Sequence, residues 1–440
     1  MTRSAEAAAD ARAGEARLLR AIGLPALTAS IVNQTIGAGI FVLPAIVAGG
    51  LGPAAPLAYI VCAGVMGLIV ACFAAAGSRV SLTGGLYAYI EVAFGPFVGF
   101  LSGALYWLMA SFAVASVASA FAGSIGALTP IVDNQAARGA LLASLFGALA
   151  FVNVRGVRSG SRVVQVVTVA KLLPLAILVV SGIWSIDPHA LRWPGPPSLA
   201  ALGRTSIILI FAFAGVEIAV APAGEIRDPT RTVPRAIFTA LAITTTFYLL
   251  IQVVAQGLLG SSLTNFASAP LAEAASRVLG ATGRATVLVG GAVSMFGYIS
   301  GDMLGSPRVL YAFGRDGTLP EPFRRVHPVF RTPHVAIAFY AIVVATLAIS
   351  GTFAQLAILA NVSALTLYGT AVAAAAELQR RNVRSEGAPL RLPGGLTIPL
   401  LAIGMIVWLL SHATRRELAV EAIVLGIAAA FYFTRRRSRE

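Results

Sequence analysis

Residues 24–50 read LPALTASIVNQTIGAGIFVLPAIVAGG, an uncharged stretch long enough to cross a bilayer, because a membrane-spanning helix needs about 20 apolar residues. Near its middle lies Gly37-Ala38-Gly39, and each glycine costs a helix about 1 kcal/mol relative to alanine. Residues 207–225 read IILIFAFAGVEIAVAPAGE, with Gly215 and then Glu217 near the middle. Both stretches therefore predict membrane helices that are interrupted partway across.

An interrupted membrane helix exposes backbone N–H groups on one half and carbonyl groups on the other. Together these groups can hold the carboxylate and the ammonium of an amino acid. The two breaks fall in the first and sixth apolar segments, and a five-helix unit that is repeated once has inverted topology because five is odd. Paired breaks at corresponding positions of two halves point to a transporter site. The alternative is that both are small-residue faces for helix packing.

The composition indicates a membrane protein. Of the 440 residues, 58% are hydrophobic and 11% are charged, whereas a globular domain has about 25% charged residues. A soluble enzyme, a disordered chain and a small secreted domain are therefore excluded. Cys62 and Cys72 lie in one apolar run and predict neither a disulfide framework nor a metal site. No motif indicates a cofactor.

Apolar segments predict an all-α integral membrane protein with twelve spans. They lie at about 22–50, 54–78, 94–128, 138–153, 162–185, 199–225, 233–260, 284–312, 333–350, 354–377, 397–413 and 416–434. With the N-terminus inside, 24 of the 32 basic residues fall in the inner segments and seven in the outer ones. Because positive residues collect on the cytoplasmic side, both termini are predicted to be cytoplasmic, in the cell's inner (plasma) membrane. The net charge of +14 thus reflects orientation, and nucleic acid is not an expected partner.

Three ionisable residues lie within predicted spans, where charges are costly and usually functional. Lys171 lies nine residues after Arg162, and Asp302 lies six residues before Arg308. We interpret Lys171 and Asp302 as candidates for proton coupling, and Glu217 as facing a substrate ammonium. Structural alternatives stay open: Lys171 as a fixed cation, Asp302 paired with Arg308, and Glu217 bonded to unwound backbone.

Four motifs, in order along the chain, resemble those of the amino acid–polyamine–organocation (APC) superfamily of permeases, and the resemblance covers nearly the whole chain. They are Gly37-Ala38-Gly39-Ile40-Phe41, Gly84-Gly85-Leu86-Tyr87-Ala88-Tyr89 with Phe94-Gly95, Glu225-Ile226-Arg227-Asp228-Pro229 with Val233-Pro234-Arg235, and Gly314-Arg315-Asp316-Gly317 with Leu319-Pro320. The last three look like the family's inner loops after helices 2, 6 and 8. Ser81 departs from the family, since many members have proline there. Asp302 maps onto no general family feature.

The resemblance implies a LeuT-like fold, with helices 1–5 and 6–10 as inverted repeats and broken helices 1 and 6. It places the substrate at the breaks, with N–H groups for the carboxylate and carbonyls for the ammonium; the residues implied are Ile36, Gly37, Ala38, Gly39, Ile40, Phe211, Ala212, Phe213, Ala214, Gly215 and Glu217. Phe211 matches the aromatic that closes over the substrate. Lys171 matches a helix 5 lysine at a sodium position in sodium-independent members, which implies proton coupling or exchange.

We therefore predict a sodium-independent secondary amino-acid transporter that works by alternating access on small or neutral substrates, with protons and membrane lipid as partners. Cationic amino acids or polyamines are the alternative substrates. The predicted organisation is an N-terminal tail at 1–20, repeats at 21–195 and 196–377, and two further helices with a basic tail at 378–440. A sodium symporter, a channel and an intramembrane enzyme are the other hypotheses. The oligomeric state is left open.

Overall fold

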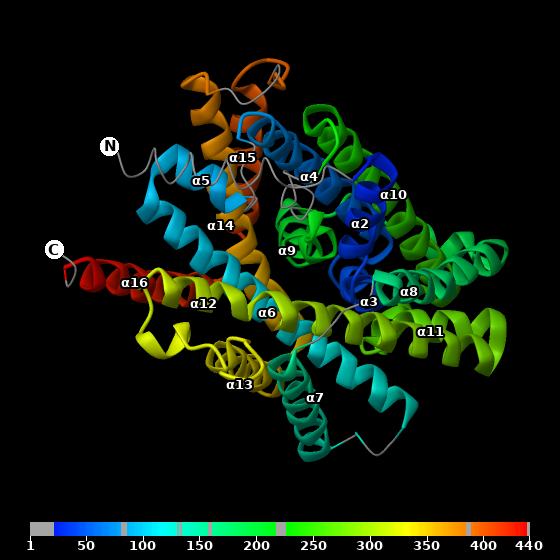
Figure 1. Cartoon of the computed structure of the whole chain (residues 1–440). Helices are drawn as coiled ribbons and strands as arrows, with labels where there is room; N and C mark the ends of the chain where they lie inside the picture. The colour runs from blue at the N-terminus through cyan, green and yellow to red at the C-terminus, as the bar shows by residue number, and fades with distance from the viewer. Residues whose placement is uncertain are drawn as a thin grey trace.

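The computed structural model of the chain describes residues 22–80, 86–129, 132, 134–156, 161–216, 226–383 and 389–437, without the side chains of 161–171, 229–230 and 435–437. Within these ranges the chain is helical and contains no strand (Figure 1). Seven described segments are long and apolar enough to cross a membrane: Gly39–Gly77, Pro96–Leu128, Gln135–Arg155, Arg231–Phe266, Pro270–Arg315, Phe353–Arg380 and Arg415–Thr434. Four shorter apolar helices accompany them. The predicted all-α class and the many apolar helices are confirmed.

The helices follow one another closely along the chain. Their bounds are α2 (Leu24–Thr35), α3 (Gly39–Leu51), α4 (Ala55–Gly77), α5 (Leu86–Phe94), α6 (Pro96–Leu128), α7 (Gln135–Arg155), α8 (Ser161–Gly182), α9 (Leu199–Leu209), α10 (Pro229–Leu259), α11 (Pro270–Gly305), α12 (Pro307–Arg315), α13 (His334–Ser350), α14 (Phe353–Arg380), α15 (Thr397–Leu410) and α16 (Arg415–Arg437). A short 3-10 helix, η5 (Ile210–Phe213), continues α9. The first apolar segment is therefore divided between α2 and α3, as its glycines predict.

Two regions differ from the expected segments. The expected inner loop after the second span is in part a helix, α5, because Leu86, Tyr89, Ile90 and Ala93 recur at helical spacing and are all buried. The eighth span was expected to begin at about residue 284, but α11 begins at Pro270 and bends at Gly280, whose φ is +63°. The hydropathy pattern missed the first part because residues 273–284 carry Glu273, Arg277 and Arg284.

The helices pack in two groups around the middle of the molecule. Helix α10 packs against α4 and α2, and α9 packs against α3 and α4. The second group is built on α6, the most extensively buried of the long helices, which α11, α13 and α14 contact. Figure 1 shows α6, α11 and α14 crossing one another near the centre. Both groups contribute walls to the cavity described below.

The chain before α2 is tied to the chain before α10. Ile22 and Ile226 form an isolated parallel β-bridge, and the Arg227 N–H donates to the Ile22 carbonyl over 2.9 Å. Ile226 is fully buried. The start of the first broken helix is therefore joined by backbone to the segment that follows residues 217–225.

Side-chain hydrogen bonds tie the helices together inside the apolar interior. The Tyr59 hydroxyl on α4 donates to the Gln252 side chain on α10 over 3.0 Å. Gln252 in turn donates to Gln256 over 3.0 Å, and the Gln256 amide donates to the Gly52 carbonyl at the end of α3 over 2.8 Å. Buried polar groups are expensive unless they are paired. This chain of bonds therefore fixes how α3, α4 and α10 lie together.

Candidate functional site

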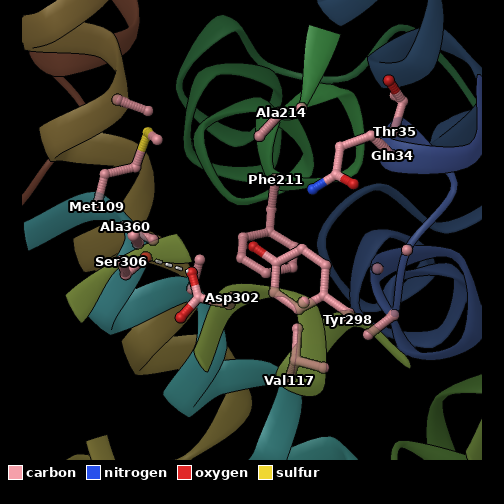
Figure 2. A pocket seen from close by; sticks show the side chains of 18 of the residues that line it. Gln34, Thr35, Met109, Val117, Phe211, Ala214, Tyr298, Asp302, Ser306 and Ala360 are labelled. Atoms are coloured by element: carbon pink, nitrogen blue, oxygen red, sulfur yellow. Dashed lines mark hydrogen bonds between the residues drawn. The ribbon is translucent and has the colours of Figure 1, made fainter. Parts of the chain in front are cut away.

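A cavity of about 320 Å³ lies where the two helix breaks face α6, α11 and α14 (Figure 2). It is lined by residues of all five regions: Gln34, Thr35, Gly37, Ala38, Gly39, Tyr106, Met109, Ala110, Ala113, Val117, Phe211, Ala214, Gly215, Gly297, Tyr298, Gly301, Asp302, Gly305, Ser306, Ala360, Asn361 and Ala364. Apolar walls with a few polar groups are typical of sites for small molecules.

The first break leaves two backbone donors at the cavity. Helix α2 ends at Thr35 and α3 begins at Gly39. The Gly37 N–H donates to the Thr35 carbonyl over 2.8 Å, so this donor, which was expected to meet the substrate, is occupied. The N–H groups of Ala38 and Gly39 donate to no backbone carbonyl of the described residues. Because the first N–H groups of a helix lack intrahelical partners and carry a partial positive charge, this end of α3 suits a carboxylate.

The two breaks touch each other directly, and glycine makes the contact possible. A Cβ on Gly39 would lie 3.3 Å from the Ala212 Cα. After η5, Ala214 is extended (ψ 151°), and Gly215 adopts a φ of +103° that side-chain-bearing residues rarely reach. A Cβ on Gly215 would lie 3.0 Å from the Gln34 carbonyl oxygen. The sequence reasoning found both glycines, but it did not show that the two breaks form a single junction.

Tyr248 on α10 holds this junction together. Its hydroxyl lies 2.9 Å from the Thr35 carbonyl oxygen and 2.8 Å from the Ala212 carbonyl oxygen, so it can donate to either. The ring is fully buried and packs edge-on against Phe213, with centroids 5.6 Å apart. The Ala212 carbonyl, at the break where carbonyls were expected to take an ammonium, therefore shares this donor with Thr35.

The family model for amino acid permeases matches residues 22–428, nearly the whole chain. The chain belongs to this family. The permease is similar to the serine/threonine exchanger SteT of Bacillus subtilis, with 30% identity over 73% of this chain and 75% of that protein. It is also similar to an uncharacterized transporter of Mycobacterium tuberculosis, with 32% identity over 95% of this chain and 92% of that protein. The methylthioribose transporter of B. subtilis is 26% identical over 89% of this chain and 88% of that protein.

These comparisons confirm the predicted superfamily and a multi-pass membrane transporter. The family and its named relatives are transporters, so the permease is not an enzyme. Among the described side chains, no group of three His, Cys, Asp or Glu residues is placed to hold a metal ion.

The structure brings most of the predicted site residues of the permease to the cavity. The residues that line it are Gly37, Ala38, Gly39, Phe211, Ala214, Gly215 and Asp302. The side chains of Ile36, Ile40, Ala212 and Phe213 are buried instead in the surrounding core. Glu217 lies outside the described residues, as does the side chain of Lys171. Their roles therefore stay predictions.

Asp302 projects from α11 at the cavity, and two hydroxyl groups hold its carboxylate. The Ser306 hydroxyl, one turn later, donates to Oδ1 over 2.7 Å, and the Tyr340 hydroxyl on α13 donates to Oδ2 over 2.5 Å. Arg308 is exposed and makes no ion pair with Asp302. The structural bridge considered between them is therefore not formed, and the carboxylate is held by the two hydroxyl groups instead.

Phe211, the aromatic that the resemblance expects to close over the substrate, lines the cavity. Its ring stands edge-on to the Phe353 ring at the start of α14, with centroids 5.6 Å apart and an interplanar angle of 80°. Both side chains are buried. This ring contact joins the lining residue Phe211 to the start of α14.

Sequence reasoning missed several polar groups of the permease. Asn361 on α14 donates its amide to the carbonyls of Ile207 and Ile208 over 2.7 and 3.1 Å, which satisfies groups near the end of α9. Asn361 and Glu421 are polar residues within long apolar runs of the sequence. This pattern alone could have identified them as candidate functional residues. Glu421 on α16 is buried, with 6% of its surface exposed, away from the cavity.

Proposed function

We propose that this permease is a sodium-independent secondary transporter of small neutral amino acids that works by alternating access. The observation that carries the proposal is the cavity at the junction of the two breaks, with the N–H groups of Ala38 and Gly39 at its wall. A carboxylate there meets backbone donors and the positive end of α3. The relative SteT, which is named as a serine/threonine exchanger, supports a small substrate.

The twelve-span count and the inverted repeat are part of this proposal. The apolar helices are consistent with spans formed by α2 with α3, α4, α6, α7, α8, α9, α10, α11, α13, α14, α15 and α16. Residues 21–195 and 196–377 then form the two repeats, and 378–440 the two further helices. The arginine distribution supports cytoplasmic termini and an inner-membrane location.

In the proposed cycle, the group of α2, α3, α4, α9 and α10 rocks against the group built on α6. In this cycle Phe211, whose ring packs edge-on against Phe353, is the aromatic that closes over the substrate. Substrate binding favours a conformation only by the difference in its affinity for the two conformations. Because the two breaks belong to the first group and Asp302 to the second, a bound amino acid contacts both and can bias their relative position.

Proton coupling is assigned to Lys171 and Asp302 within this proposal. Helix α8, which carries Lys171, packs along α11, which carries Asp302. The family resemblance of Lys171 to the lysine at a sodium position supports independence from sodium. Ionisable groups at membrane depth commonly form proton relays in transporters.

A second candidate function is transport of cationic amino acids or polyamines. Asp302 favours it, because a carboxylate at the cavity can pair with an amine. The similarity to the methylthioribose transporter adds that sugar derivative to the compounds worth testing.

Reconstituted permease in proteoliposomes tests these functions. Purified protein is first screened for thermal stabilisation by amino acids, amines and methylthioribose, since a ligand that binds the folded state raises apparent stability. The compounds that stabilise it are then tested in counterflow, with and without sodium. We expect saturable, sodium-independent counterflow of a small neutral amino acid. Strict sodium dependence, non-saturable flux or stabilisation by amines alone would contradict the main proposal.

A further inference from the structure

The cavity has two chemically different ends. In Figure 2, Asp302 and Ser306 lie across the pocket from Gln34 and Thr35, which belong to the first break. Backbone N–H groups at the break suit an anion, whereas Asp302 is an acceptor. For an amino acid held by its carboxylate at the break, Asp302 is an acceptor within the same cavity that its side chain can meet.

The Asp302 carboxylate keeps acceptor capacity after its two protein hydrogen bonds are made. An ionised carboxylate offers about four lone-pair positions, and Ser306 and Tyr340 each donate to a different oxygen. The side chain is partly exposed and lines the cavity. The bonds fix the orientation of the carboxylate without saturating it.

The cavity wall around this carboxylate is largely apolar. Met109 and Ala110 of α6, with Ala360 and Ala364 of α14, line the same cavity. An apolar pocket by itself discriminates weakly between a methyl group and a hydroxyl group of the same size. A carboxylate in that wall changes the discrimination, because an apolar ligand beside it displaces water without replacing the hydrogen bond.

We propose that Asp302 recognises the substrate's side chain, and that the permease selects amino acids whose short side chain donates a hydrogen bond to this carboxylate. The donor is a hydroxyl or an ammonium group. The inference rests on the proposed amino-acid transport and adds the substrate class. Tyr340 acts as a positioning residue, since it holds Asp302 but does not line the cavity.

Pairs of amino acids that match in shape but differ in one donor test the inference. Serine is compared with 2-aminobutyrate, and threonine with valine, as competitors in counterflow by the reconstituted full chain; 2,3-diaminopropionate provides the ammonium. A hydrogen bond to a charged group predicts that the hydroxyl member competes about 10- to 100-fold better. Ratios near one in the wild-type protein, with counterflow intact, would overturn the inference while amino-acid transport stands. Absence of any amino-acid counterflow would instead reject the proposed function.

Three variants assign the preference to the carboxylate. Asp302→Ala is expected to bring the hydroxyl-to-methyl ratio to about one. Asp302→Asn keeps an acceptor but removes the charge. Competition by 2,3-diaminopropionate is therefore expected to weaken more than competition by serine or threonine, and part of the hydroxyl preference is expected to remain. Tyr340→Phe is expected to lower the ratio partially, because the carboxylate loses one of its two fixed donors.

A matched control is Asp316→Asn, an exposed carboxylate beside Arg315 on the surface, which is expected to leave the ratio unchanged. Whether Asp302→Ala folds is judged by its elution and thermal transition. If it does not fold, the inference is tested by the hydroxyl-to-methyl ratios of Asp302→Asn and Tyr340→Phe. Ratios unchanged in both would overturn the inference. So would an Asp302→Asn protein that keeps the full hydroxyl preference and loses only its pH dependence, since Asp302 would then serve proton coupling alone.

Discussion

Gly215→Ala is predicted to disrupt the junction of the two breaks. Gly215 has a φ of +103°, and the added Cβ would lie 3.0 Å from the Gln34 carbonyl oxygen and 3.1 Å from the Gln34 carbonyl carbon. A backbone conformation of this kind costs a residue with a side chain about 1–3 kcal/mol, and overpacking adds about 1–3 kcal/mol. Since these two atoms belong to the backbone and cannot easily shift, we expect a loss of about 2–6 kcal/mol, or a junction pushed apart.

The assay measures the thermal midpoint of the purified permease and its counterflow rate in proteoliposomes. The matched control is Gly64→Ala on α4, where a Cβ meets nothing within 4 Å and helix propensity favours alanine by about 1 kcal/mol. We expect Gly64→Ala to keep or raise the midpoint and to retain transport, and Gly215→Ala to lower both. If the two variants have equal midpoints and rates, the reasoning on the junction is refuted.

Three further predictions concern ties between helices and the coupling site. Tyr248→Phe removes the hydroxyl that the Thr35 and Ala212 carbonyls share, which is expected to cost about 1–3 kcal/mol in thermal or denaturant unfolding; an unchanged midpoint would contradict it. Lys171→Ala is expected to abolish pH-dependent uptake while the protein still folds, and an unchanged pH profile of uptake would exclude Lys171 from coupling. Arg204, whose side chain is 42% exposed, pairs with Glu417 over 3.0 Å, so their double-mutant cycle is expected to give a coupling of at most about 1 kcal/mol.

The sequence predicted features that depend on local composition. Gly37-Ala38-Gly39 identified the division between α2 and α3, since glycine weakens a helix wherever it lies. The apolar segments indicated the helices of a membrane protein, because lipid requires every backbone polar group to be bonded within the chain. These inferences needed no knowledge of which helices are neighbours.

The remaining features depend on contacts between distant segments. Tyr248 bonds to Thr35, and Asn361 bonds to Ile207, across more than a hundred residues of sequence. Neither partner can be chosen before the packing of the helices is known. The bend at Gly280 was missed for another reason, since charged residues around it interrupted the apolar pattern that defined the segment.

The backbone bridge between Ile22 and Ile226 has a practical consequence for engineering the permease. The Arg227 N–H is bonded to the Ile22 carbonyl. A fusion partner attached just before Ile22 therefore restrains the segment that leads into α10 as well as the start of α2. A bulky fluorescent protein fused there would therefore hinder movement of both the first broken helix and the segment before α10. An affinity tag is therefore better placed at the far end of α16, whereas a small probe attached just before Ile22 would report movement of the two joined segments.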